Sequence, residues 1–228
     1  MNFVHNPIIV PHLKRTHVDG IRLYEEVDSD HQGYYTSITS ITSHWSKDKF
    51  KKWREKIGED EANRITKLAT TRGTHTHTLI EHYLKNEEIP KADILPTFLF
   101  NTAKQSLNKI NNILGIEIGL FSRTLGIAGT ADCIAEYDGV PSIIDFKTSE
   151  KPKPRSWIDG YFVQATAYSL MLYELTKQKA KQLVIIMTCE NGELEVYKET
   201  DLKKYSIMLK EYIDKFNQDK RVDYGIFS

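Results

Sequence analysis

The chain has 228 residues, of which 40% are hydrophobic and 27% charged, and its 31 basic residues balance its 31 acidic ones. These proportions are ordinary for a globular domain with a real core, and zero net charge argues against a globally basic nucleic-acid binder. Two cysteines cannot complete a four-cysteine zinc or iron–sulfur site, and the longest apolar runs are too short for a membrane span. The start of the chain lacks a signal-peptide pattern, so a cytoplasmic setting is expected.

The first half of the chain predicts irregular structure followed by helices. Residues 1–33 are polar and interrupted by proline and glycine, with at most a short hairpin from Arg22 to Val27. Apolar spacing then predicts helices over 45–57, with Ser46 as a cap, over 59–70, through 72–81, and over 98–114, where Gly115 ends the last one. Six basic side chains between Lys47 and Lys56 could serve phosphate binding, but a solvated helix face explains them equally well.

From residue 116 the pattern changes to strands. A strand over 116–122 is followed by a hairpin of 130–137 and 140–147, because Asp138-Gly139 between two apolar runs is typical of a tight primed turn. A helix over 156–176, a second hairpin of 183–189 and 193–198, and a helix over 201–218 complete the chain. The predicted order is therefore three strands, a helix, two strands and a helix.

The central hairpin carries an unusual group of charges. Side chains alternate along a strand, so Asp145 and Lys147 share one face of the hairpin, while Asp132 lies on the partner strand. Two carboxylates and an ammonium are costly to bury in an apolar hairpin unless they pair or hold a metal. The two acids, with the carbonyl oxygen of Phe146, could coordinate a hard divalent cation, and Lys147 could then orient or deprotonate a water at that cation.

These residues carry a family resemblance. Gly129-Thr130-Ala131-Asp132 followed by Asp145-Phe146-Lys147 resembles the acid and D-x-K motifs of the PD-(D/E)XK nuclease superfamily, in its RecB-like exonuclease branch. Within that branch the motifs are most similar to the mitochondrial genome maintenance exonucleases and small phage exonucleases. The resemblance implies an α/β, restriction-endonuclease-like αβββαβ core with a mixed central sheet and a helical N-terminal elaboration. Residues 1–114 would form that elaboration and residues 115–228 the nuclease core, integrated into one domain.

Further site residues follow from the same resemblance. The helical segment Gly73–Glu81 resembles the family's histidine motif. The resemblance implies that His77, and not His75, is a ligand of the bound Mg²⁺ or Mn²⁺. Gln164 and Tyr168 form the Q-x-x-x-Y motif next to the active site, although Tyr168 also fits core packing. Glu117 would supply an additional acid for the metal or be an exposed strand glutamate. The iron–sulfur cysteines of some members are absent, so no cluster is expected.

Several polar residues after the D-x-K are candidates for contact with nucleic acid. Thr148, Lys151, Lys153 and Arg155 follow the catalytic strand directly and could supply local phosphate contacts. Thr148 could equally do no more than end the strand. Stacking of bases on tryptophan is also conceivable, but tryptophans at helical spacing usually belong to a core.

The pattern as a whole predicts a metal-dependent deoxyribonuclease. Asp132, Asp145, Phe146 and His77 would hold one or two ions, and Lys147 would position and activate the attacking water. We expect an exonuclease of DNA processing, recombination or repair that acts on a free, preferably single-stranded end, with any helicase or recombination partner on a separate chain and no membrane. A bacterial or phage-infected cell is the expected setting, with mitochondria as an alternative. An endonuclease, a non-catalytic DNA-binding module and a scaffold protein with a chance D-x-K are the competing hypotheses.

Overall fold

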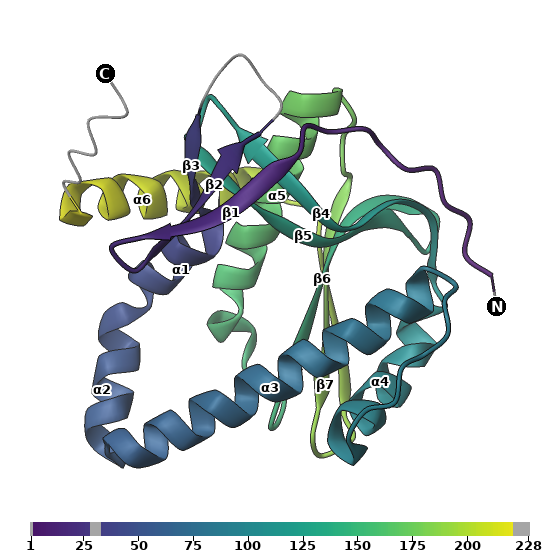
Figure 1. Cartoon of the computed structure of the whole chain (residues 1–228), viewed down its shortest axis with the longest axis horizontal. Coiled ribbons are helices and arrows are strands. Elements are labelled where there is room, and N and C mark those ends of the chain that lie inside the picture. The colour runs from purple at the N-terminus through teal and green to yellow at the C-terminus, as the bar shows by residue number, and fades with distance from the viewer. Residues whose placement is uncertain (1, 28–32, 221–228) are drawn as a thin grey trace.

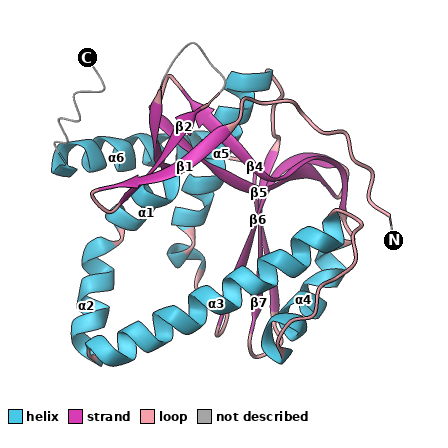
Figure 2. Ribbon diagram, in the orientation of Figure 1, coloured by secondary structure: helices cyan, strands magenta, loops and turns pink. Residues whose placement is uncertain are grey.

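The computed structural model describes residues 2–27 and 33–220. In this part of the chain, eight strands form one mixed sheet with helices packed on it (Figures 1 and 2). The strands are β1 (Leu13–Val18), β2 (Ile21–Glu26), β3 (Tyr34–Ser37), β4 (Ile110–Ser122), β5 (Ile127–Tyr137), β6 (Val140–Ser149), β7 (Gln182–Cys189) and β8 (Leu194–Glu199). The helices are α1 (Ile38–Trp45), α2 (Lys47–Ile57), α3 (Glu59–Leu84), α4 (Ile94–Leu107), α5 (Asp159–Thr176) and α6 (Leu202–Lys220), with a 3₁₀ turn at Arg155–Trp157. The predicted α/β class, mixed sheet and αβββαβ order are confirmed.

The sheet is buried on both faces. One core cluster joins it to α1, α5 and α6, and a second cluster joins its opposite face to α3 and α4. Alternate residues of β6 enter different clusters, with Ile143 in the first and Ile144 and Phe146 in the second. This period of two places Asp145 on the α5 side of the sheet and the Phe146 side chain on the α3 side, as alternation predicts.

The sheet forks along one edge of β5. Its other edge pairs with β4 from Ile127 to Tyr137. On the forked edge, β3 runs parallel to β5 only at Ile127 and Ala128, whereas β6 runs antiparallel to it from Cys133 to Tyr137. Residues 129–132 of β5 pair with neither β3 nor β6 on this edge. The last pair between β5 and β6 is Cys133 with Ile144, and the two strands separate at the next residues, Asp132 and Asp145.

Tight packing explains the glycine beneath the fork. A Cβ on Gly129 would lie 2.9 Å from both the Ile38 and the Tyr168 side chains, which is closer than packed carbon atoms approach. Gly129 therefore lets α1 and α5 reach the strand directly below the acid. The hairpin turn also follows the prediction, because Asp138 and Gly139 have φ angles of 51° and 76°.

Several predicted element boundaries were wrong. The helix expected over 98–114 ends at Leu107, because Ile110 already pairs with Tyr137 and the chain continues as β4. The two helices expected over 59–70 and 72–81 are one, α3, since Gly73 does not interrupt it. The expected hairpin from Arg22 to Val27 is instead the pair β1–β2, which places most of residues 13–26 in the sheet.

The predicted helix from residue 45 to 57 was also wrong at its start. Trp45 ends α1, and α2 begins at Lys47. Ser46 stands between the helices, where its hydroxyl donates to carbonyls at the end of α1 and does not cap α2. The helix expected from 156 begins at Asp159, after the 3₁₀ turn. Of the described helices, none combines the length and the apolar character needed to cross a membrane.

Helix α2 and the first part of α3 extend away from the sheet at one side of the molecule, and α3 then returns across it toward α4 (Figure 1). No residue of α2 is buried. In α3, Ala62 is buried near the start, and the other buried residues, Thr76, Leu79, Ile80 and Leu84, lie in its last third. We call α2 together with residues 59–71 of α3 the arch. The last turns of α3 are thus fixed by the core, while the arch is mostly surface.

Candidate metal and catalytic site

The fork holds two carboxylates close together. The backbone N–H of Phe146 donates to Asp132 Oδ2 over 2.8 Å, a bond that spans the gap left when β6 leaves β5. Asp132 is 9% exposed and Asp145 only 1%, so both acids lie at the edge of the core. Burying two carboxylates in this way is unfavourable unless cationic groups or a metal neutralise them.

His77 enters the fork from the buried part of α3. Its Nε2 lies 2.9 Å from the carbonyl oxygen of Phe146, so Nε2–H donates to that oxygen. In the neutral ring this bond leaves the lone pair on Nδ1, which lies 3.8 Å from carboxylate oxygens of both Glu117 and Asp132. Burial opposes the charged ring, but the carboxylates, chiefly Asp132, raise the pKa of His77 above its ordinary value. The carboxylates therefore favour a proton on His77, at the position where a cation could bind.

Glu117 reaches the fork through an unusual backbone conformation. On β4 it lies between the pairs Ile116–Cys133 and Ile118–Ala131, which places it beside Asp132. Its φ of 48° is rare for a residue that is not glycine, and such conformations persist where the surrounding structure imposes them. Single ligand atoms of His77, Glu117 and Asp132 lie within 4.8 Å of one another. Two carboxylates and one imidazole form a donor set that suits Mn²⁺. The two carboxylates also suit Mg²⁺, which prefers oxygen to nitrogen ligands.

Asp145 and Lys147 form a buried ion pair beside this cluster. Lys147 Nζ lies 2.5 Å from Asp145 Oδ2, yet that oxygen accepts no hydrogen bond of ordinary geometry. Burial raises the pKa of Asp145 to about 6, although Lys147 opposes the shift. Burial would lower the pKa of Lys147, but the charges of Asp145 and Asp132 outweigh it and raise that pKa. The buried Asp145 carboxylate thus has the Lys147 ammonium as its cationic partner next to the cluster.

The Q-x-x-x-Y residues support Asp145. Gln164 Nε2 lies 3.3 Å from Asp145 Oδ1 and 3.2 Å from the Tyr168 hydroxyl, so α5 holds the free side of the carboxylate. Gln164 thus contacts the acid of the D-x-K motif, next to which the sequence placed it. Tyr168 is 1% exposed and belongs to the core cluster on the α5 side, in line with the core packing that its sequence position also allowed.

The candidate phosphate contacts are mostly engaged within the protein. Lys153 Nζ donates to the Tyr161 hydroxyl over 2.6 Å. Arg155 donates to Asp159, Glu199 and the Tyr205 hydroxyl, and Arg72 donates to the Thr148 hydroxyl. Lys151 is exposed. Contact of these residues with nucleic acid stays a prediction.

Sequence reasoning missed two neighbours of the site. Tyr161 places its ring 5.1 Å from Lys147 Nζ, and its position three residues before Gln164 on α5 could have indicated this. Arg72 links α3 to β6 through Thr148 and also pairs with Glu190 after β7. No local pattern signals that contact, because its partners lie 76 and 118 residues away in the chain. His75, the competing histidine, lies away from the cluster near Asp93.

Known proteins share part of this chain. It is distantly homologous to mitochondrial genome maintenance exonuclease 1, with 30% identity over 122 residues to the Homo sapiens protein, or 50% of this chain and 33% of that one. The Mus musculus protein is 30% identical over 114 residues, covering 45% of this chain and 32% of its own length. The chain thus matches about a third of the length of these relatives. A solved chain from Eubacterium rectale, described as "Putative exonuclease", aligns with a TM-score of 0.47 and 13% identity over 70% of this chain and 69% of that one. No family model matches.

Proposed function

We propose that this protein is a Mg²⁺- or Mn²⁺-dependent deoxyribonuclease that hydrolyses DNA from a free end. The observation that carries the proposal is the fork, where His77, Glu117 and Asp132 converge beside the Asp145–Lys147 pair. The distant homology to an exonuclease supports the same reaction class. Exonucleolytic action, a role in DNA processing, recombination or repair, and a bacterial or phage-infected setting are parts of this proposal.

The residues present fit a divalent cation. Asp132, Glu117 and His77 would hold it, and Asp145 and the second lone pair of the Phe146 carbonyl oxygen lie next to that group. When bound, the cation would stabilise negative charge on the phosphate and lower the pKa of a nearby water. It would also neutralise the carboxylates that otherwise repel a phosphate from this buried edge.

Lys147 is the proposed catalytic side chain. Its raised pKa keeps it an ammonium in the metal-free protein, so its first role is to donate hydrogen bonds that orient a water and the scissile phosphate. Gln164 fixes Asp145, and Asp145 fixes the position of Lys147, so α5 determines where that ammonium points. Tyr168 supports Gln164 from the core and is a positioning residue in this scheme.

The arch favours the proposal that the substrate is a single strand with a free end. It carries the basic cluster of α2 and exposed aromatic and aliphatic side chains, including Phe50 at 46% exposed and Leu68 at 56%. Exposed rings and local positive charge are features that bind unpaired strands. A helicase or recombination partner, if one acts with this protein, is proposed to be a separate chain.

The test compares DNA substrates with and without ends. Purified protein is incubated with Mg²⁺ or Mn²⁺ and with 5′- and 3′-labelled single and double strands, and in parallel with closed circular single-stranded DNA. We expect release of short products from linear single strands and no cutting of circles. Cutting of circles would replace the exonuclease with the competing endonuclease, and absence of cleavage under every metal would favour a non-catalytic DNA-binding module.

Variants assign the reaction to the fork. Lys147→Ala and Asp145→Asn should reduce the rate by at least about 100-fold, the scale expected when one group that stabilises a transition state is lost. The matched control is Lys181→Ala. This exposed lysine lies just before β7, at the end of the sheet where β6 begins and away from the fork. If Lys147→Ala cleaves as fast as this control, the fork is not the catalytic site.

A further inference from the structure

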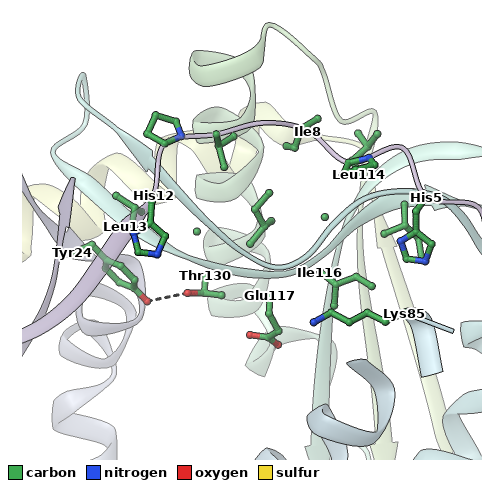
Figure 3. Close-up of a pocket in the computed structure, with 17 residues that line it drawn as sticks. His5, Ile8, His12, Leu13, Tyr24, Lys85, Leu114, Ile116, Glu117 and Thr130 are labelled. Atoms are coloured by element: carbon green, nitrogen blue, oxygen red, sulfur yellow. Dashed lines mark hydrogen bonds between the residues drawn. The ribbon is translucent and has the colours of Figure 1, made fainter. Parts of the chain in front are cut away.

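A cavity of about 520 Å³ adjoins the fork (Figure 3). Its roof is the N-terminal strap, residues 2–12, and its floor is β4 around Gly115 to Gly119. Glu117 and Thr130 line the cavity, and Glu117 also belongs to the candidate metal cluster. The volume falls within the roughly 300–1,000 Å³ typical of ligand pockets. A molecule in the cavity would therefore be a direct neighbour of anything bound at the cluster.

The strap is fixed at both ends and spans the cavity between them. Its backbone bonds β4 through Asn6 N–H to Ile113 O, 2.8 Å, and Ile8 N–H to Leu114 O, 2.9 Å. At the other end, Val27 N–H donates to the His12 carbonyl over 3.1 Å. The intervening residues cross above β4, which itself leaves the regular ladder between Asn111 and Gly115. Within the described chain, the strap makes no backbone bonds to β4 between its two anchored ends, so a space remains between the strap and β4.

The walls of the cavity combine apolar and polar groups. Ile8, Val10, Leu114 and Ile118 are partly buried apolar residues that line it and pack against the core. Polar groups stand around this surface, with the Tyr24 hydroxyl 3.2 Å from the Thr130 hydroxyl and the Lys85 side chain running toward Glu117 (Figure 3). Lys85 also pairs with Glu81 over 2.6 Å. A flat apolar group with hydrogen-bonding edges and an adjacent anionic group would match these walls.

We infer that this cavity holds one deoxynucleotide of the substrate strand, next to the phosphate that is cleaved. The inference rests on the proposed function. A phosphodiester bound at the cluster carries a nucleoside on each side, and the cavity adjoins the cluster through Glu117. The base would lie between the strap and β4, and its phosphate would face Lys85 and the cation site. The apolar walls would contact the face of the base, and the Tyr24 and Thr130 hydroxyls would lie near its edge.

Binding of a single nucleotide tests the cavity without requiring cleavage. Equilibrium dialysis in Mn²⁺ compares thymidine 5′-monophosphate with deoxyribose 5-phosphate, which has the same anion and no base. We expect the nucleotide to bind at least tenfold more tightly than the base-free sugar phosphate. Equal binding of the two would overturn the inference, because the cation cluster alone would then explain the affinity.

Two neighbouring strap residues provide matched variants. Val10 lines the cavity, whereas Ile9 is 97% exposed, so Val10→Trp fills the space and Ile9→Trp adds the same ring outside it. Val10→Trp should weaken nucleotide binding at least tenfold and Ile9→Trp should leave it unchanged. If Val10→Trp unfolds on thermal melting, Gly119→Leu fills the cavity from the floor, where an added Cβ would lie 3.4 Å from Leu13 Cδ1. Full binding by a folded, filled variant would contradict the inference.

Failure of the two proposals can be told apart. Wild-type protein that cleaves DNA but shows no preference for the base keeps the nuclease function and loses the nucleotide cavity. Wild-type protein that binds the nucleotide through its base but cleaves no substrate keeps the cavity and loses the nuclease function.

Discussion

The two ends of α3 contrast sharply although they belong to one helix. Near its C-terminus, Leu79 and Leu84 are at most 1% exposed, and His77 bonds the backbone of β6. In the arch, Ile65 and Leu68 are 37% and 56% exposed, and α2 has no buried residue. One end is held by the core and presents a ligand, whereas the other end leaves apolar and basic side chains on the surface. The contrast suggests that chemistry is built into the rigid end and substrate capture into the exposed one.

The largest expected effect comes from removing one charge of the cluster on β5 that the rigid end of α3 contacts. Asp132→Asn keeps the shape of the side chain and an oxygen that can accept the Phe146 N–H, but it weakens the cation site. Cleavage should fall by about 1,000-fold or more, since the lost acid is a ligand in the proposed scheme. The turnover rate and the melting temperature are measured together. A variant that stays folded and active would show that Asp132 has no catalytic function.

Stability should separate the two ends of the helix. Leu84→Ala removes a fully buried side chain and should lower the free energy of unfolding by about 2–5 kcal/mol. Leu68→Ala removes a side chain that is 56% exposed and should change it by about 0.5 kcal/mol or less. Denaturant unfolding of both variants measures the difference. Similar losses for the two would mean that the arch is also packed against something in solution.

Binding of Mn²⁺ should weaken in acid. In the metal-free protein, Asp145 has a pKa raised to about 6 by burial, and the pKa of His77 is raised by nearby carboxylates against the effect of burial. His77 therefore takes up a proton at a higher pH than an ordinary histidine, and Asp145 takes one up as the pH falls through about 6; a cation must displace these protons. The affinity should drop by about tenfold per pH unit for each proton displaced. Calorimetric titration at pH 5, 6 and 7 measures it, and an affinity independent of pH would place the ion elsewhere.

The smallest effect is expected in the arch. Lys49, Lys52 and Lys56 are exposed on α2, so their joint replacement by glutamine should leave the melting temperature unchanged. If the arch captures DNA, the KM for a single strand should rise several-fold at low salt, and its salt dependence should become shallower. An unchanged KM would favour the competing view that these lysines form only a solvated helix face.

Local chemistry was sufficient to predict the central hairpin. Asp138-Gly139 defines the turn, and the period of two separates Asp145 from Phe146, so both features follow from short segments. Long-range pairing explains the failures. Residues 110–114 have a helical pattern, but they begin β4, which pairs with β5 from Ile110 onward. The conformation of Glu117 depends on neighbours that no local pattern reveals.

The strap shows the same limit. Pro7 and Pro11 interrupt the strap and predict irregular structure, and nothing in the segment indicates that it crosses β4 and encloses a cavity. The motif residues could be identified because their spacing resembles a family. Their supporting contacts, such as Arg72 with Thr148, appear only in three dimensions.

The most direct measurement is a crystal structure with Mn²⁺ and a short single-stranded oligonucleotide bound to Lys147→Ala, with the ion located by its anomalous scattering. We predict a peak within coordination distance of Asp132 and Glu117, with a phosphate of the strand beside it. An ion bound away from the fork, or a strand whose phosphates do not approach Asp132, would contradict the assignment of this site.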